Sequence, residues 1–274
     1  MKIKIDNFDL KKIAESGQCF RWRQLNIGPD KIGYAIPAFG NTLIALQNGN
    51  EFEFSCDEEE WNLIWKNYFD IDRNYYRIGI RILEGDDNHL IEAYEFGKGI
   101  RILKQDLWET MFSFMVSQNN NISRISESIE RFCKKSHDLS QDGTDNIPSF
   151  PNYDEISTDI FNDSSLGFGY RSVYLKDLCE YVCKNPTWLD DLRKMSYEEA
   201  MESLMLRNGI GKKVASCICL FGLGHVEAFP IDTHIKQLIE NHYSSGLSLD
   251  RYADCAGIIQ QYLFYYDLKA NNEK

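Results

Sequence analysis

The chain has 274 residues and a formal net charge of −12, and 43% of its residues are hydrophobic and 26% charged. This length corresponds to one large domain or two, and the composition excludes a disordered, collagen-like or disulfide-stapled protein. Because no apolar run approaches the roughly 20 residues of a membrane helix and the N-terminus lacks a signal-peptide core, we expect a soluble intracellular protein that does not contact membranes.

Residues 1–100 are predicted to form a mainly antiparallel β domain. Two runs, 42–46 and 51–55, flank an Asn-Gly dipeptide, which suits the positive φ angles of a tight hairpin turn. Residues 20–22 and 34–36 are expected to be further strands. These strands predict a sheet at the start of the chain.

From about residue 104 onward the apolar spacing becomes helical, so we predict a helical region over residues 101–274. Asp106, with a glutamate three residues later, opens the first of these helices, and Asn121 caps the second. Residues 136–165 are expected to be connecting chain with little regular structure.

A helix–hairpin–helix is predicted over residues 196–223. Its two helices, 196–207 and 212–223, are separated by a turn that contains Gly209 and Gly211. Glycines allow a tight turn and bring backbone N–H groups to the surface at the positive end of the second helix, where they suit a phosphate. Taken alone, the pattern is also typical of an ordinary helical turn.

Two side chains near this turn have the chemistry of catalysis. Lys213 lies in the first turn of the second helix, and a neutral lysine amine can attack a sugar carbon or form a Schiff base. Asp232 is the predicted cap of the following helix, and an ionised capping carboxylate is suited to stabilise an oxocarbenium ion. The alternative is a solvated surface lysine beside a purely structural cap.

The local balance of charge and the cysteine pattern qualify what the overall composition indicates. The net charge argues against a polyanionic partner, but between Arg207 and Lys236 four basic residues stand against two acidic ones. The eight cysteines include no CxxC pair, so we expect most of them to be reduced and buried. Composition alone suggests a structural, acidic helical protein.

Five segments spread over most of the chain carry a resemblance to a known family. They are SGQCFRW at 16–22, SQNNNISR at 117–124, LGFGYR at 166–171, LRNGIGKKVASC at 206–217 with PIDTH at 230–234, and GIIQQYLF at 257–264. In this order they resemble the helix–hairpin–helix DNA glycosylases, and more narrowly their 8-oxoguanine DNA glycosylase branch of bifunctional glycosylase/β-lyases. The resemblance implies an α+β fold, with the β domain followed by a two-lobed helical glycosylase region.

The resemblance assigns the reaction to the hairpin region. Lys213 would displace 8-oxoguanine by attack at the sugar C1′, and Asp232 would position the lysine and stabilise positive charge. A Schiff base and β-elimination would follow. No metal or organic cofactor is implied, and the hairpin carbonyls are a candidate site for a monovalent cation.

The resemblance also assigns residues to the extruded base. The Gly17 carbonyl would accept a hydrogen bond from the N7–H that distinguishes 8-oxoguanine from guanine. Cys217 and Phe264 would sandwich the base, and Pro230 would line the same pocket. Gln260 would bind the Watson–Crick edge. From spacing alone, Cys217 and Phe264 are core residues and Gln260 is a surface glutamine.

Four residues would act at the hole that the base leaves. Asn119 would fill it with Tyr170 beside it as a wedge. Arg124 and Arg171 would donate to the orphaned cytosine, since the guanidinium fork meets two acceptors at once. The alternative is that Asn119 caps a helix and Arg124 lies on a solvated face.

The remaining assignments concern contacts with the DNA backbone and the partner, oligomeric state and cellular location of the protein. Asn120, Gly209, Gly211 and His234 would contact the backbone, although a lone histidine is often structural. The expected partner is double-stranded DNA containing 8-oxoguanine, bound by a monomer in the cytoplasm or nucleoid of a prokaryote.

Two departures and two alternatives accompany the resemblance. Asn208 stands where the family commonly has a proline, and the cysteine cluster of iron–sulfur relatives is absent after residue 219. The negative charge predicts weak, steeply salt-dependent non-specific DNA binding. The alternatives are a glycosylase for another damaged base, such as an alkylated one, and a non-catalytic protein that binds DNA structure.

Overall fold

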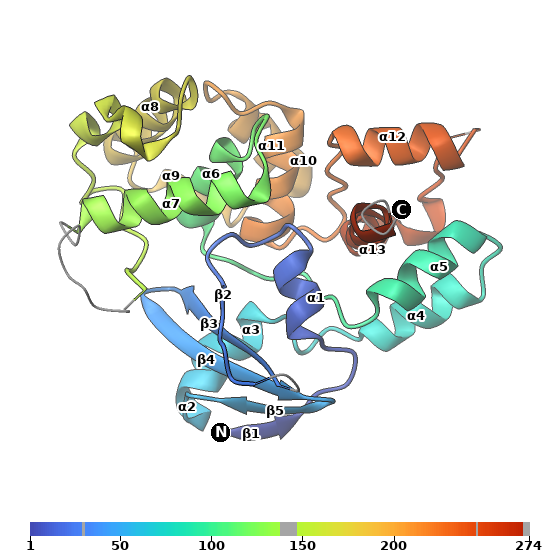
Figure 1. The fold of residues 1–274 in the computed structure, drawn as a ribbon. Coiled ribbons are helices and arrows are strands. Elements are labelled where there is room, and N and C mark those ends of the chain that lie inside the picture. The colour runs from blue at the N-terminus through green and yellow to red at the C-terminus, as the bar shows by residue number, and fades with distance from the viewer. Residues whose placement is uncertain (29–30, 138–146, 245, 271–274) are drawn as a thin grey trace.

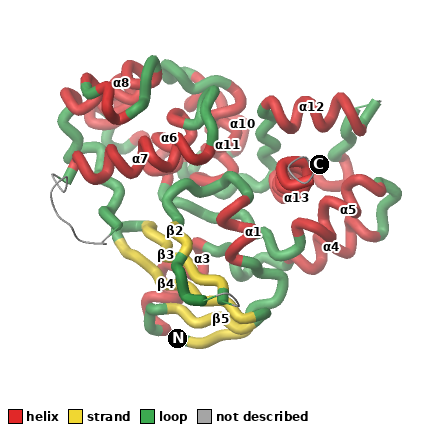
Figure 2. The backbone as a smooth tube through the Cα atoms, in the orientation of Figure 1, coloured by secondary structure: helices red, strands yellow, loops and turns green. Residues whose placement is uncertain are grey.

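Five strands form an antiparallel sheet at one end of the molecule, and helices make up most of the remainder (Figure 1, Figure 2). The computed structural model describes residues 1–28, 31–137, 147–244 and 246–270. This arrangement confirms the expected α+β fold, in which an N-terminal antiparallel sheet precedes a helical region.

The sheet has the strand order β1-β5-β4-β3-β2. Its strands are β1 (Lys2–Lys4), β2 (Arg23–Gln24), β3 (Ile32–Ala38), β4 (Asn41–Asn48) and β5 (Glu51–Phe54). The predicted hairpin is confirmed, because β4 and β5 pair up to Asn48 opposite Glu51 and Gly49 has a φ of 61°. The predicted strand at 34–36 lies within β3.

The strand expected at residues 20–22 is wrong, because the two-residue β2 begins only at Arg23. Trp22 packs against Tyr34 of β3, but the two side chains before it contact a helix instead of the sheet. Phe20 packs edge-on against Phe114, with ring centroids 5.5 Å apart, and Arg21 forms a buried ion pair with Glu109 at 3.1 Å. These contacts bring the loop that contains Gly17 against the helical region.

An aromatic core lies under the sheet. It is covered by α1 (Leu10–Glu15) and by the continuous helical stretch α2 (Glu58–Glu60), η1 (Trp61–Trp65) and α3 (Lys66–Tyr68). Strand β5 alternates buried Phe52 and Phe54 with exposed Glu51 and Glu53, as a half-buried strand does. Phe54 stacks on Trp61 with ring centroids 4.6 Å apart.

The remaining helices form two groups (Figure 1). One group contains α6 (Leu107–Val116), α7 (Ile122–Ser136), η3 (Thr158–Asn162), η4 (Ser164–Leu166), α8 (Arg171–Lys184), α9 (Trp188–Leu192), α10 (Tyr197–Met205), α11 (Lys212–Ile218) and the π-helical η5 (Cys219–Leu223). The other contains α4 (Tyr75–Leu83), α5 (Asn88–Gly97), α12 (Thr233–His242), η6 (Asp250–Cys255) and α13 (Ala256–Ala270). The two groups correspond to the two expected helical lobes.

The expectation that helices begin only near residue 104 is wrong, because α1 to α5 all precede it, and α4 and α5 join the helical region. Tyr75, Ile78 and Ile82 have helical spacing and belong to the apolar core of the helical region, not to the core under the sheet. Helix α5 packs so closely on α13 that a Cβ at Gly97 would lie 2.9 Å from the ring of Tyr262. Tertiary packing therefore places part of the first hundred residues with the helices.

Local capping signals of the later helices are confirmed. Asp106 caps α6 and Asn121 caps α7, each through a side-chain oxygen that accepts a backbone N–H three residues on. Ser196 and Glu199 form a complete capping box at the start of α10. In the connecting stretch, η3 and η4 supply short helical turns, and residues 138–146 lie outside the described part.

Helix α13 lies between α5 and α12, where Figure 1 shows it end-on. Its residues 256–263 are all buried, as expected of a helix that is surrounded by other elements. All eight cysteines are free and only Cys183 is exposed, which confirms the expectation of reduced, buried thiols. Within the described residues, no helix is both long and apolar enough to cross a membrane.

Candidate active site

Lys213 lies in the first turn of α11, which begins after Gly211. Its Nζ donates to Ser117 Oγ at 3.3 Å and lies 5.6 Å from the ring centroid of Phe114. Ser117 donates its own proton to the Phe114 carbonyl at 2.8 Å, so its oxygen is oriented to accept from the lysine. The amine is therefore held by a residue of the loop that follows α6.

Asp232 caps α12 by accepting the Ile235 N–H at 2.9 Å, as predicted. It lines two cavities that Lys213 also lines. Within the described residues the two side chains do not form an ion pair. The structure thus places an amine and a carboxylate at the same cavities, each held by its own backbone or hydroxyl partner.

The smaller cavity contains every residue that the sequence assigned to the lesion base. It is lined by Gly17, Phe114, Lys213, Cys217, Phe221, Pro230, Asp232, Gln260, Gln261 and Phe264. These residues come from the N-terminal loop, α6, α11, η5, the loop before α12, and α13. The free volume is about 40 Å³, which is room for about one water molecule and not for a purine.

Phe264 closes this cavity against Gly17. Gly17 has a φ of +74°, and a Cβ there would lie 3.0 Å from Cε1 of Phe264. On its other side the Phe264 ring meets His234 edge-to-face, with centroids 6.0 Å apart. A base can therefore enter only if the ring of Phe264 moves away from Gly17.

Burial overturns one alternative interpretation of a pocket residue and agrees with another, because Cys217 is buried as its core interpretation expects. Gln260 is only 4% exposed, so its interpretation as a surface glutamine is wrong. Cys217 is buried, and burial raises the pKa of its thiol to about 11. This thiol is therefore uncharged near neutral pH and offers an apolar surface rather than a thiolate nucleophile.

The larger cavity is a groove of about 720 Å³ between the two helical groups. It is lined by Ser117, Gln118, Asn119, Asn120, Gly211, Lys212, Lys213, Val214, Ile231, Asp232, Thr233, His234 and Lys236. Its three lysines confirm the local basic character expected between Arg207 and Lys236. In this groove Asn120 donates to the Val116 carbonyl at the end of α6, and His234 is exposed.

Asn119 and Tyr170 are in contact, as their predicted joint role requires. The Asn119 side chain donates to the Tyr170 hydroxyl at 3.3 Å, and its backbone has a φ of +46°. The interpretation of Asn119 as a helix cap is wrong, because Asn121 caps α7. This left-handed backbone conformation places the Asn119 side chain beside Tyr170.

The two arginines assigned to the opposite base differ in their surroundings. Arg124 is exposed in the first turn of α7, as its solvated-face interpretation expected. Arg171 is 7% exposed and donates to the backbone carbonyls of Gln118, Asn119 and Phe168. Arg171 thus holds the Asn119 loop in the free protein, and the contact of either arginine with cytosine stays a prediction.

The hairpin is packed tightly against α8. Gly209 has a φ of +79°, and a Cβ there would lie 2.5 Å from the ring of Tyr174. Asn208, in place of the usual proline, donates to Asp177 at 3.0 Å. The space over Gly211 is open, so another backbone can approach the start of α11 closely.

Comparisons with known proteins agree with this geometry. The family model described as 8-oxoguanine DNA glycosylase, N-terminal domain, matches residues 1–111. The structure of the Clostridium acetobutylicum 8-oxoguanine glycosylase/lyase, in complex with double-stranded DNA containing cytosine opposite 8-oxoguanine, superposes with a TM-score of 0.86. It is 32% identical and covers 97% of this chain and 93% of that chain. The chain belongs to the 8-oxoguanine DNA glycosylase family.

Two curated eukaryotic relatives of the family are similar over part of their length. The N-glycosylase/DNA lyase of Saccharomyces cerevisiae is 35% identical over 62% of this chain and 50% of its own. The N-glycosylase/DNA lyase OGG1 of Arabidopsis thaliana is 32% identical over 63% of this chain and 53% of its own. The chain spans about half the length of these two relatives.

Several residues of this glycosylase-family site were missed by sequence reasoning. Ser117, Gln18 and Gln261 lie inside the quoted motifs but had no assigned role, and Phe114 lies just before one of them. Each of these four is a polar or aromatic residue in a stretch of chain that is partly or fully buried in the folded protein. That signal appears only when the tertiary structure shows what each side chain faces.

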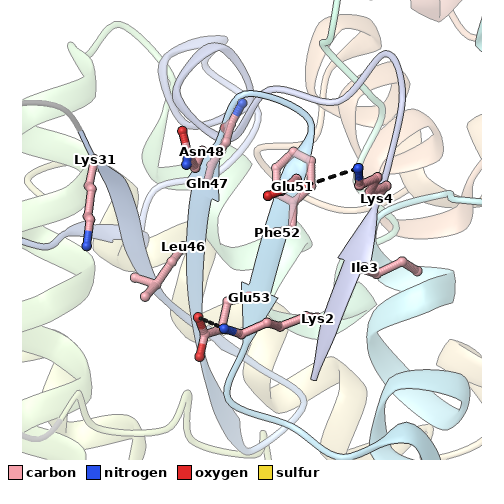
Figure 3. A pocket seen from close by; sticks show the side chains of 10 residues that line it. All are labelled: Lys2, Ile3, Lys4, Lys31, Leu46, Gln47, Asn48, Glu51, Phe52 and Glu53. Atoms are coloured by element: carbon pink, nitrogen blue, oxygen red, sulfur yellow. Dashed lines mark ion pairs between the residues drawn. The ribbon is translucent and has the colours of Figure 1, made fainter.

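Another hollow, of about 460 Å³, lies on the N-terminal sheet (Figure 3). There Lys2 pairs with Glu53 at 3.4 Å and Lys4 with Glu51 at 3.0 Å, so neighbouring strands neutralise each other's charges. This hollow shares no residue with the groove or the base cavity. Within the described ranges, no group of three or more His, Cys, Asp or Glu residues is arranged to hold a metal ion.

Proposed function

We propose that this protein is a bifunctional DNA glycosylase and abasic-site lyase of base excision repair. It removes 8-oxoguanine opposite cytosine from duplex DNA and then cleaves the strand by β-elimination. The observation that carries the proposal is the single cavity at which Lys213 and Asp232 meet the residues assigned to the lesion base. The 8-oxoguanine named for the Clostridium relative supports the same substrate.

Recognition begins with removal of the base from the helix, which costs a few kcal/mol. Phe264 moves off Gly17, and the base enters between Phe264 and Cys217. The Gly17 carbonyl accepts the N7–H that guanine lacks, and Gln260 meets the Watson–Crick edge. Asn119 and Tyr170, already hydrogen-bonded to each other, occupy the space that the base leaves.

Chemistry then takes place at the sugar. The amine of Lys213 forms a bond to C1′ while the bond from C1′ to the base nitrogen breaks. The base leaves with the electron pair, and a proton released by the attacking amine balances the one that the base gains. The carboxylate of Asp232 stabilises the positive charge that develops on the sugar. Opening of the sugar ring converts the adduct to a Schiff base.

The lyase step follows from the Schiff base. Loss of a proton from C2′ expels the 3′ phosphate, and hydrolysis returns the lysine. None of these steps requires a metal or an organic cofactor. The backbone amides of the hairpin, with Asn120 and His234 across the groove, hold the phosphates of the bent strand. One protein chain supplies all of these groups, so we propose a monomeric enzyme.

The test is borohydride trapping on a duplex with one 8-oxoguanine opposite cytosine. We expect a covalent adduct with the unchanged protein and none with Lys213→Gln. Lys212→Gln, the neighbouring exposed lysine, is the matched control and should still form the adduct. Base release without an adduct would replace this proposal with a monofunctional glycosylase. No release at all would favour another lesion or a protein without chemistry.

A further inference from the structure

Three buried glutamines connect the Gly17 loop to α13. Gln18, Gln260 and Gln261 are between 0% and 4% exposed. Gln18 Nε2 lies 3.5 Å from Gln261 Oε1, and Gln261 Nε2 donates to Gln260 Oε1 at 3.0 Å. Buried amides require hydrogen-bond partners. Gln261 supplies one to Gln260, while the hydrogens of Gln18 go to Ser16 and Arg101 and leave Gln18 in contact with Gln261. The proposed function uses Gln260 but neither of the other two.

The backbone fixes the orientation of the first amide in this chain. Gln18 Oε1 accepts the N–H of Leu103 at 2.8 Å, and its Nε2 donates to the carbonyl of Arg101 at 2.9 Å. A backbone N–H can only donate and a backbone carbonyl can only accept, so this amide cannot be flipped. Its NH₂ end therefore faces Gln261. Both hydrogens of this NH₂ group go to the closer oxygens of Ser16 and Arg101, so the 3.5 Å approach to Gln261 is an electrostatic contact, which favours the oxygen of Gln261 on that side and its nitrogen towards Gln260.

The same chain also holds the carbonyl that would read the lesion. Ser16 and Gln18 flank Gly17, and Gln18 Nε2 donates to Ser16 Oγ at 2.8 Å. The Gln18 carbonyl accepts from Gln105 Nε2 at 2.7 Å, which fixes the other side of the loop. The Gly17 loop and helix α13 thus meet at the two groups that would touch the base.

We propose that Gln261 is a positioning residue for lesion recognition. It fixes the amide orientation of Gln260 and, through Gln18, holds that amide in register with the Gly17 carbonyl. This inference rests on the proposed function and adds a residue that does not itself read the base. Guanine and 8-oxoguanine differ by the N7–H donor and the 8-oxo group, so discrimination depends on holding the Gly17 carbonyl in place against a base that Gln260 orients.

The inference predicts that a change at Gln261 affects base removal and abasic-site cleavage differently. Removal of 8-oxoguanine needs the base correctly seated, whereas cleavage at a preformed abasic site involves no base in the cavity. Loss of the Gln261 contact should therefore slow base removal and leave abasic-site cleavage nearly unchanged. A merely structural defect would lower both activities together.

The experiment measures single-turnover base removal and abasic-site cleavage for Gln261→Ala and Gln261→Glu. We expect base removal to fall about tenfold or more, the effect of losing one aligned hydrogen bond, while abasic-site cleavage stays within about twofold. Gln47→Ala is the matched control. Gln47 is a buried glutamine of the sheet that bonds Leu10 and Gly49, so its loss should not change the ratio of the two activities.

The glutamate variant adds a pH readout. An ionised carboxylate cannot donate to Gln260, but a protonated one can, and burial favours protonation. The base-removal rate of Gln261→Glu relative to the unchanged protein should therefore recover as the pH is lowered, whereas that of Gln261→Ala should not.

Three results would overturn the inference. These are base removal by both variants within about twofold of the unchanged protein, an equal loss of both activities, or a change in the activity ratio with Gln47→Ala. The 8-oxoguanine release measured for the unchanged protein distinguishes failure of this inference from failure of the proposed function. If the unchanged protein cannot release 8-oxoguanine, both the proposed function and the role of Gln261 are wrong. If it releases 8-oxoguanine and the variants release it equally fast, only the role of Gln261 is wrong.

Discussion

The amine of Lys213 contacts a hydroxyl and an aromatic ring instead of a carboxylate. An ion pair would tether Nζ to one partner, whereas the single contact with Ser117 at 3.3 Å leaves the amine able to turn towards a sugar carbon in the cavity. Cys217, one helical turn along, lines the same cavity with a neutral thiol. The Lys213 amine and this thiol surface therefore come from the same short helix.

Gly17→Ala tests the closed base cavity at the scale of one residue. The new methyl group would meet Phe264 at 3.0 Å and occupy the place where the base must approach the Gly17 carbonyl. A left-handed alanine also costs about 1 kcal/mol of stability. We expect loss of 8-oxoguanine release, with cleavage of a preformed abasic site retained, in parallel gel assays.

Gly40→Ala is the control for backbone strain in that experiment. Gly40 has a φ of +75°, and nothing lies within 4 Å of the position of its Cβ. Both substitutions should lower the free energy of unfolding by a similar amount, but only Gly17→Ala should abolish base release. Equal activity of the two variants would contradict the assigned role of Gly17.

At the scale of an element, the ends of α11 and α12 build the reactive part of the site. Lys213 and the unobstructed backbone of Gly211 lie at the start of α11, and Asp232 caps the first turn of α12. Each helix start is specified by residues within a few positions. Their mutual placement depends on the groups of helices to which α11 and α12 belong.

Asp232 combines two roles that substitution can separate. Asp232→Asn preserves the cap, because asparagine and aspartate cap equally well, but removes the charge. We expect Asp232→Asn to unfold within about 0.5 kcal/mol of the unchanged protein in urea and to give no trapped adduct. Asp232→Ala should lose the adduct and a further ~1 kcal/mol of stability. Normal trapping by Asp232→Asn would show that the carboxylate is only a cap.

At the scale of the whole molecule, the helical core contains several thiols that are buried uncharged. Burial raises the pKa of the Cys217 thiol to about 11 and those of Cys133 and Cys219 to about 12. These values exceed the ordinary thiol value of 9.0. The native state therefore keeps protons that the unfolded chain releases.

This difference predicts loss of stability in alkali. Above pH 9 the unfolded chain binds fewer protons than the native protein, so the free energy of unfolding falls as the pH rises towards 11. The expected slope is about 1.4 kcal/mol per pH unit for each such thiol. Urea unfolding under reducing conditions at pH 8 and pH 10 measures it. Cys183→Ser, which changes the exposed thiol, should leave the slope unaltered, and equal stability at both pH values would contradict the prediction.

Much of the fold was predictable because its signals are short-range. The β4–β5 hairpin follows from an Asn-Gly turn, and the caps of α6, α7, α10 and α12 follow from side chains that bond amides two or three residues away. The error at residues 20–22 arose because Arg21 and Phe20 bond to a helix some ninety positions later. A local pattern contains no information about such a partner.

The sequence by itself determined the class of site. A lysine at the start of a hairpin helix and an aspartate cap pointed to candidate catalytic groups from their residue types, and the resemblance of five ordered motifs to the 8-oxoguanine DNA glycosylases assigned the other site residues. Only the tertiary structure decided that Phe264 closes on Gly17, that Arg171 holds the Asn119 loop, and that Gln18 meets Gln261 across 243 positions. These contacts join elements far apart in the chain, and burial gives them their effect by removing water as a competing partner.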